Sequence, residues 1–162
     1  MKDPHALTIA ALGSREIVMT RVFNAPRHLV FDAYTKPELL KRWLGVRGGW
    51  ILRDCEVDLR VGGAYRWVWW KQSAGIAMGV GGVYREVAAP DRLVCTERFD
   101  DAWYPGESLL TTEFLEQDGA TALKVTMLYE STEARDCVLR SPMERGVAES
   151  YNMLDELLQE QV

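Results

Sequence analysis

The chain has 162 residues, the usual size of a single domain, which is enough to bury a core without disulfides or a structural metal. Its 48% hydrophobic and 27% charged residues are typical of a folded globular protein, and no apolar run is long enough to span a membrane. The net charge of -5 is spread along the chain without a basic block, so neither nucleic acid nor an anionic membrane is an expected partner. The N-terminus lacks the pattern of a secretory signal, and we therefore predict a cytoplasmic protein.

The N-terminal third predicts one strand and two short helices. Residues 15–23 alternate with period two and are rich in β-branched types, as a strand is, while residues 1–13 are expected to be mobile or an extension at the sheet edge. A helix opens at Pro26, because the fixed φ of proline suits a first helical turn. Residues 35–38 (Thr-Lys-Pro-Glu) have the form of a capping box and predict a second helix, whose apolar stripe ends at Leu44.

After residues 48–49 the chain changes to strands separated by turn residues, which indicates the α+β class. Gly62 and Gly63 are expected to form the two-residue turn of a hairpin. Glycines inside the third of these strands predict a bulge or a close backbone contact, because neither a Lys-Ser/Thr pair nor a helix follows them. Short turns make neighbouring strands antiparallel. The expected strands cover residues 50–60, 64–71, 76–88, 92–101, 107–117 and 121–130.

The C-terminal segment is the clearest helix of the chain. Residues 141–144 (Ser-Pro-Met-Glu) combine an N-cap, a proline at the first helical position and a returning glutamate. An apolar stripe then recurs at steps of three and four residues through Met143, Val147, Tyr151, Leu154 and Leu158. Such a helix must bury its stripe, and the concave face of the sheet is the large partner available to it.

This order of elements resembles the helix-grip fold of START-like and Bet v 1-like (SRPBCC) proteins, which implies a single domain over residues 1–162. The resemblance implies a curved antiparallel sheet of about six to seven strands that grips the long C-terminal helix, with two short helices beside it. Five motifs, taken in order, are similar to the family of activator of heat-shock-protein-90 ATPase homologues. They are residues 20–26 (TRVFNAP), Trp43, and residues 57–63 (VDLRVGG), 82–87 (GVYREV) and 90–93 (PDRL). The family implies a chaperone-associated, stress-related role, while the same fold also hosts lipid carriers and polyketide cyclases.

Residues 65–70 (YRWVWW) form an aromatic strand. Strand geometry sends Tyr65, Trp67 and Trp69 to one face, which should face the helix, and sends Trp70 to the other. These rings either fill the core or line a ligand cavity. Both interpretations stay open, because aromatic residues dominate core packing and also the walls of small-molecule sites.

Two polar strand residues have the phase of inward-facing neighbours. Glu97 shares its phase with Cys95 and Phe99, and Thr112 shares that of Leu110. A buried carboxylate needs a partner or keeps its proton, which is typical of functional sites. Acid-base catalysis by Glu97 or a neighbour, of the kind that a polyketide cyclase or dehydratase uses, is therefore one alternative function.

Metal and nucleophilic chemistry lack candidate residues. Cys55, Cys95 and Cys137 are widely spaced and odd in number, which indicates reduced thiols. His5 and His28 have no Cys, His or carboxylate at metal-ligand spacing and no expected nucleophile beside them. We therefore expect neither a metal nor another cofactor.

The sequence leaves three hypotheses for function. The first is a monomer or weak dimer that binds a small hydrophobic or aromatic molecule between the sheet and the C-terminal helix. The second is a chaperone-associated interaction protein whose outer sheet face or cavity rim touches the chaperone, and the third is the cyclase-like enzyme. The residues expected to bind the ligand are Trp43, Trp50, Tyr65, Trp67, Trp69, Glu97, Leu110, Thr112, Phe114, Val125, Met127, Val147, Tyr151 and Leu154.

Overall fold

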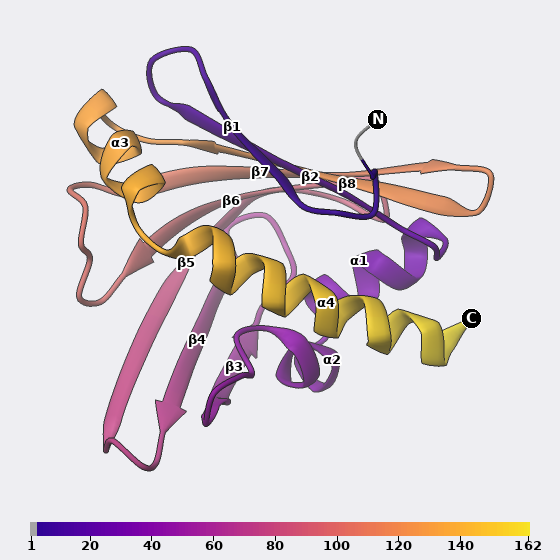
Figure 1. Cartoon of the computed structure of the whole chain (residues 1–162), viewed down its shortest axis with the longest axis horizontal. Coiled ribbons are helices and arrows are strands. Elements are labelled where there is room, and N and C mark those ends of the chain that lie inside the picture. The colour runs from indigo at the N-terminus through magenta and orange to yellow at the C-terminus, as the bar shows by residue number, and fades with distance from the viewer. Residues whose placement is uncertain (1–2) are drawn as a thin grey trace.

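In the structure, a computed structural model that describes residues 3–162, one antiparallel sheet curves around a long helix (Figure 1). The described residues form four helices and eight strands, which lie in the order β1-β2-β8-β7-β6-β5-β4-β3 across the sheet. The strands are β1 (Thr8–Leu12), β2 (Glu16–Phe23), β3 (Trp50–Val57), β4 (Ala64–Lys71), β5 (Ile76–Ala88), β6 (Arg92–Phe99), β7 (Ser108–Gln117) and β8 (Ala120–Leu128). The helices are α1 (Arg27–Thr35), α2 (Pro37–Trp43), α3 (Thr132–Arg140) and α4 (Met143–Gln161).

Alternating burial along the strands places the core on the concave face of the sheet. Every second residue is buried in both β2 and β8, which pair with each other. Helix α4 crosses this face (Figure 1) and is in contact with α1 and α2. The buried residues of the two strands and of α4 are Ile17, Met19, Arg21, Phe23, Thr121, Leu123, Val125, Met127, Ser150, Tyr151, Leu154, Leu157 and Leu158.

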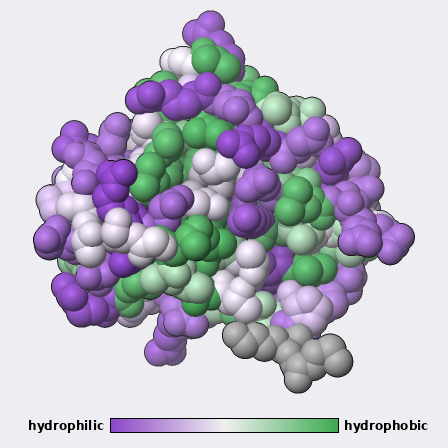
Figure 2. Space-filling model, turned by 90° about the horizontal axis from the view of Figure 1, so that it is seen from above, coloured by the Kyte–Doolittle hydropathy of each residue, from purple (hydrophilic) through white to green (hydrophobic). Residues whose placement is uncertain are grey.

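The surface mixes polar and apolar side chains. On the face seen in Figure 2, hydrophobic residues form small groups separated by hydrophilic ones. Scattered exposed apolar residues of this kind are normal for a folded domain. Within residues 3–162, no helix is both long enough and apolar enough to cross a membrane.

The structure confirms the predicted α+β helix-grip architecture. All strands predicted after residue 50 are present, and β4 and β5 have the predicted bounds. The sheet has eight strands instead of the expected six to seven, because residues 8–12 pair with β2 as a regular edge strand. Residues 1–2 of the predicted extension lie outside the described residues.

Helix α3 lies in a segment for which the sequence predicts no helix. Its N-cap is Ser131, whose Oγ accepts a hydrogen bond of 3.1 Å from the backbone N–H of Ala134. Few of its side chains are buried, so the apolar periodicity that identifies α4 is weak here. One of them, Arg135, donates hydrogen bonds to the carbonyl oxygens of Gly13 and Glu16, which ties α3 to the turn between β1 and β2.

Two predicted helix caps are wrong. Thr35 is the last residue of α1, and its Oγ1 donates to the carbonyl oxygen of Phe31 at 2.9 Å instead of capping α2. Ser141 donates to the carbonyl oxygen of Val138 at 2.6 Å, and α4 begins only at Met143. Both residues lie at the junction of two consecutive helices. Each hydroxyl group donates to a carbonyl oxygen of the preceding helix, as Ser and Thr side chains readily do.

The connection between β3 and β4 is longer than the predicted two-glycine turn. It spans residues 58–63. The backbone N–H of Gly62 donates to the carbonyl oxygen of Tyr84 at 2.8 Å and holds this loop against β5. The predicted close backbone contact within β5 is confirmed. A Cβ atom at Gly82 would lie 1.8 Å from the carbonyl oxygen of Thr96 in β6, so only glycine fits there.

We expect Leu154→Ala to lower the free energy of unfolding by about 2–5 kcal/mol, because Leu154 is fully buried between α4 and the sheet. The matched control is Gln159→Ala, an exposed position of the same helix, which should change the free energy of unfolding by less than about 0.5 kcal/mol. Chemical denaturation of both variants measures the difference. A loss below about 1 kcal/mol for Leu154→Ala would contradict the role of α4 in the core.

Candidate ligand-binding cavity

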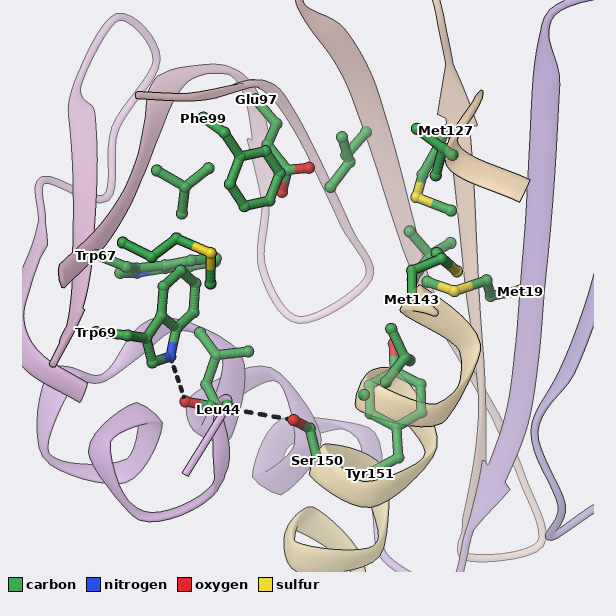
Figure 3. Close-up of a pocket in the computed structure, with 18 of the residues that line it drawn as sticks. Met19, Leu44, Trp67, Trp69, Glu97, Phe99, Met127, Met143, Ser150 and Tyr151 are labelled. Carbon is green, nitrogen blue, oxygen red and sulfur yellow. Dashed lines mark hydrogen bonds between the residues drawn. The ribbon is translucent and has the colours of Figure 1, made fainter. Parts of the chain in front are cut away.

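A cavity of about 400 Å³ lies between the concave face of the sheet and α4. Every strand from β2 to β8 and all four helices contribute to its walls, together with loops beside α2 and β6. Figure 3 shows Trp67 and Trp69 on one side of this space, and Met19 and Met127 on the opposite side. The lining is mostly hydrophobic, as it is in most small-molecule sites.

The aromatic strand β4 has the predicted orientation. Trp67 and Trp69 line the cavity, and their ring centroids lie 6.2 Å apart at 72°, an edge-to-face arrangement. Trp70 lies on the opposite face of the strand, where the guanidinium carbon of Arg53 is 5.5 Å from its ring centroid. The two inward tryptophans therefore present a rigid apolar surface to the cavity.

The loop after α2 closes one side of the cavity. Trp69 Nε1 donates to the carbonyl oxygen of Leu44 at 2.9 Å, and the backbone N–H of Gly45 donates to Ser150 Oγ at 3.0 Å (Figure 3). Gly45 has a φ of 67°, and a Cβ atom there would lie 2.3 Å from Trp69 Nε1. Both the positive φ and the lack of space require glycine at this position. Through these two hydrogen bonds the loop is held against both β4 and α4.

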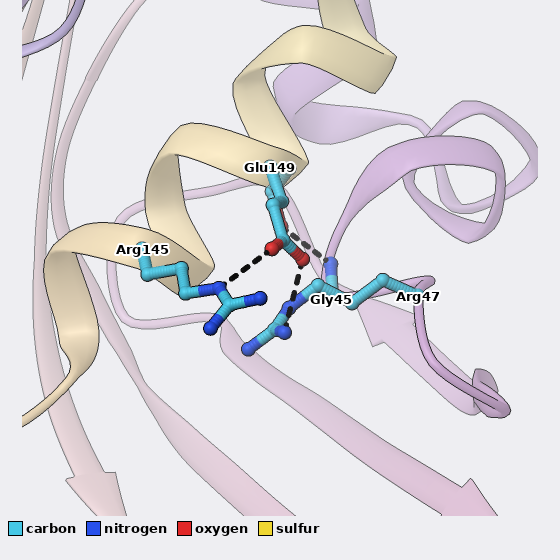
Figure 4. Close-up of polar contacts among 5 residues, drawn as sticks. Gly45, Arg47, Arg145 and Glu149 are labelled. Carbon is cyan, nitrogen blue, oxygen red and sulfur yellow. Dashed lines mark hydrogen bonds and ion pairs between the residues drawn. The ribbon is translucent and has the colours of Figure 1, made fainter.

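Glu149 of α4 forms two ion pairs at the rim of the cavity, one with Arg47 of the same loop and one with Arg145 within α4. Glu149 lies 3.0 Å from Arg47 through Oε2 and 3.2 Å from Arg145 through Oε1 (Figure 4). The hydrogen bond from Arg145 and the charge of Arg47 hold the pKa of the Glu149 carboxyl below its usual value. Arg47 also lines the cavity, so the positive charge at the rim already has a partner.

Glu97 places a carboxyl group inside this apolar space (Figure 3). Among residues 3–162, its side chain takes part in no hydrogen bond or ion pair, whereas its backbone oxygen accepts a hydrogen bond from the Ser108 hydroxyl. Burial raises the pKa of Glu97 to about 7, because removal from water disfavours the charged form. Such a carboxyl group can exchange a proton near neutral pH, or it can bind a donor or a cation of a ligand.

A pair of tyrosines supplies further polar atoms to the cavity. The hydroxyl oxygens of Tyr34 and Tyr151 lie 2.7 Å apart, within hydrogen-bond distance. Burial raises the pKa of both groups, to about 12 for Tyr151, so both keep their protons at neutral pH. Because one hydroxyl donates to the other, one hydroxyl hydrogen remains for another acceptor.

The cysteines lie on three different elements, namely β3, β6 and α3. Burial raises the pKa of Cys55 to about 11 and that of Cys95 to about 12, so both stay protonated at neutral pH. Protonated thiols at these positions act as small hydrophobic side chains. Within the part of the chain that the structure describes, no group of three or more His, Cys, Asp or Glu could hold a metal ion.

Most residues expected to bind a ligand do line the cavity. Tyr65, Phe114 and Leu154 do not, and they lie in the packed core beside it. The Tyr65 hydroxyl donates to the carbonyl oxygen of Thr96 at 2.6 Å, and the Phe114 ring packs 5.3 Å from the ring of Phe31. The residues that are both predicted and found in the lining are Trp43, Trp50, Trp67, Trp69, Glu97, Leu110, Thr112, Val125, Met127, Val147 and Tyr151.

Several lining residues are not predicted from the sequence. Met19 and Phe99 have the phase of inward strand positions and Met143 belongs to the stripe of α4, so their periodicity carried a usable signal. Trp103 and Tyr104 lie in a loop, where no periodicity points to a face. The remaining unpredicted residues are Tyr34, Leu44, Gly45, Arg47, Met78, Val80, Tyr129, Val138, Gly146 and Ser150.

A curved antiparallel sheet that grips a C-terminal helix over an apolar cavity defines the START-like helix-grip class. The chain belongs to the family described as activator of Hsp90 ATPase homolog 1-like protein, whose model matches residues 24–159. A crystal structure of a protein from Rhodobacter sphaeroides is 32% identical, with a TM-score of 0.89 over 96% of this chain and 99% of that chain.

Two further solved structures extend this comparison. A protein from Mycobacterium smegmatis has the same fold, with 23% identity and a TM-score of 0.82 over 94% of this chain and 96% of that chain. A structure described as an HSP90 activator from Plasmodium falciparum is 28% identical, with a TM-score of 0.54 over 70% of this chain and 72% of that chain. No curated protein matches the chain in sequence.

We expect Glu97 to make the stability of the protein depend on pH. Its pKa of about 7 in the folded chain lies above the ordinary value of 4.5, so the folded state binds more protons than the unfolded state between these values. The free energy of unfolding should therefore fall as pH rises from about 4.5 to about 7, by at most about 3 kcal/mol, and this fall should be absent in Glu97→Gln. Chemical denaturation across this pH range measures it.

The control for this measurement is Glu56→Gln, the same substitution at an exposed position of β3. It should keep the pH dependence of the parent protein. If Glu97→Gln and the parent protein show the same pH dependence, the raised pKa of Glu97 is wrong.

Proposed function

We propose that the protein binds a small hydrophobic or aromatic molecule in the cavity between the sheet and α4. The observation that carries this proposal is the space itself, about 400 Å³ within mostly hydrophobic walls. Small-molecule sites typically have roughly 300–1,000 Å³ and a few polar groups that orient the ligand. Because protein interiors are otherwise close-packed, a space of this size in a small domain supports a binding role.

The composition of the walls supports a planar or irregular apolar ligand. Trp67 and Trp69 offer flat ring surfaces, on which another ring can pack edge-to-face or stacked. Methionine side chains such as Met19 and Met127 are flexible and polarizable, so they adapt to ligands of different shape. Trp103 is 43% exposed and also lines the cavity, which supports ligand entry at this part of the rim.

Trp67→Phe tests this proposal, because it shortens one wall of the cavity without adding a polar group. We expect a modest loss of stability and a several-fold change in affinity for an aromatic ligand. The control is Trp70→Phe on the opposite face of β4, which should leave the affinity unchanged. Thermal shift and isothermal titration calorimetry with naphthalene derivatives and medium-chain fatty alcohols measure both effects.

Two results would contradict the binding proposal. One is a panel in which no compound raises the melting temperature of the parent protein. The other is an equal change of affinity in Trp67→Phe and Trp70→Phe, since only the first residue lines the cavity.

A second candidate function is interaction with a chaperone of the HSP90 type. Membership of the family and the 28% identity to the HSP90 activator from Plasmodium falciparum support this candidate. The outer sheet face and the rim of the cavity are the surfaces we propose for the contact. Both candidate functions assume the cytoplasmic location predicted from the sequence.

The chaperone candidate is tested by measuring ATP hydrolysis by the HSP90 of the source organism with increasing amounts of the protein. We expect a several-fold higher rate that saturates with concentration, as in the action of an activator. An inhibitor of the HSP90 ATP site gives the background rate. An unchanged rate at concentrations well above that of the chaperone would exclude activation.

A further inference from the structure

We infer that the molecule bound in the cavity is an organic amine with an apolar body, whose ammonium group lies beside Glu97. This inference rests on the proposed function and deepens it, because it names the chemical class of ligand for the same site. Three observations carry it. They are the lack of a partner for the Glu97 carboxylate among the described residues, the aromatic rings that line the same cavity, and the pairing of Arg47, the other charged lining residue, with Glu149.

Within residues 3–162, the Glu97 carboxylate forms no ion pair with a cationic side chain. Among the residues that line the cavity, Glu97 and Arg47 carry the charged side chains, and Arg47 forms an ion pair of 3.0 Å with Glu149 at the rim. An ionised carboxylate within apolar walls is costly unless it is paired. The ammonium group of a ligand supplies that partner through charge-assisted hydrogen bonds, which are about twice as strong as neutral ones.

Aromatic rings surround the part of the cavity that contains Glu97. Phe99 follows Glu97 by two positions on β6 and shares its face, and Figure 3 shows its ring beside the carboxyl group. The ring centroids of Phe99 and Trp103 lie 4.7 Å apart, and those of Tyr104 and Tyr129 lie 5.4 Å apart. Tyr104 and Tyr129 line the same cavity as Glu97, and the charge of Glu97 adds to burial in raising the pKa of both tyrosines. Aromatic ring faces attract cations, and organic ammonium groups above all.

The same features disfavour other classes of ligand. A ligand carboxylate would bring a second negative charge next to Glu97, while the positive charge of Arg47 is already paired with Glu149. An alcohol gives the Glu97 carboxylate one neutral hydrogen bond and no charge. We therefore expect affinity to fall from amine to alcohol to acid for ligands with the same apolar body.

Three compounds with one body test this order: 4-phenylbutylamine, 4-phenylbutanol and 4-phenylbutanoic acid. Isothermal titration calorimetry at about pH 8 compares them where the amine is protonated and Glu97 is ionised. In the parent protein the amine should bind at least about tenfold more tightly than the alcohol, and the acid should bind most weakly. In Glu97→Gln the advantage of the amine should fall below about threefold, whereas Glu56→Gln should keep the parent values.

Each other result has a definite meaning. Equal affinity for the amine and the alcohol would overturn the amine inference and leave the proposed function standing. Tightest binding of the acid would overturn it as well and would indicate that Glu97 keeps its proton and acts as a donor. If none of the three binds but a compound of the hydrophobic panel does, only the amine inference is wrong. If no compound of either set binds, the proposed function is also wrong.

The parent protein gives a second test that does not depend on the folding of Glu97→Gln. Lowering the pH from about 8 to about 5 protonates Glu97, so the advantage of the amine over the alcohol should fall by about tenfold. The titratable groups whose pKa the charge of Glu97 raises are Tyr65 on β4, Cys95 on β6, Tyr104 in the following loop and Tyr129 after β8. Burial raises the pKa of each of them, so they keep their protons over this range. An unchanged advantage of the amine would overturn the inference.

Discussion

The structure depends on how the apolar stripe of α4 is covered along its length. In the C-terminal half of the helix the stripe is packed, because Leu154, Leu157 and Leu158 are buried and do not line the cavity. Tyr151, near the middle of the helix, lines the cavity and packs its ring 5.7 Å from that of Phe23 in β2. In the first turns of the helix, Met143 and Val147 are only half-buried and line the cavity. One continuous stripe therefore holds the helix on the sheet at one end and forms the wall of a binding space at the other.

Hydrogen bonds to β4 and to α4 hold the loop between α2 and β3 in position. The side chain of Trp69 and the backbone N–H of Gly45 bond this loop to β4 and to α4 in a mostly buried setting, where a lost hydrogen bond is costly. At the solvent-exposed rim, the ion pair of Glu149 with Arg47 connects the loop to α4, whereas the pair with Arg145 lies within α4, and screening makes such pairs weak. The buried hydrogen bonds therefore position the loop, and the ion pairs set the charge at the cavity rim.

Two inward-facing charged residues of the sheet, Arg21 and Glu97, have different environments. Arg21 is 7% exposed, donates to Asn152 at 2.8 Å, and places its guanidinium carbon 5.0 Å from the ring centroid of Phe23. Burial lowers the pKa of Arg21, and the charge of Asp155 opposes this change. Among the residues that the structure describes, Glu97 has aromatic rings near it but forms no ion pair, and its carboxyl group faces the cavity. A buried charge with partners in its own chain has a structural explanation, whereas one that faces an apolar cavity without them is a candidate for ligand recognition.

Periodicity in the sequence by itself determined the elements of the fold apart from β1 and α3, and the faces of the strands. It placed Trp67 inward, Trp70 outward and Glu97 on the concave face, because successive side chains of a strand point to opposite sides whatever the tertiary context. Only the tertiary structure decided which part of the concave face meets the cavity. Tyr65 has the phase of Trp67 but lies in the packed core, and Trp103 reaches the cavity from a loop that has no periodicity. The physical reason is that periodicity reflects local backbone geometry, whereas a cavity forms where elements distant in sequence approach without filling the space between them.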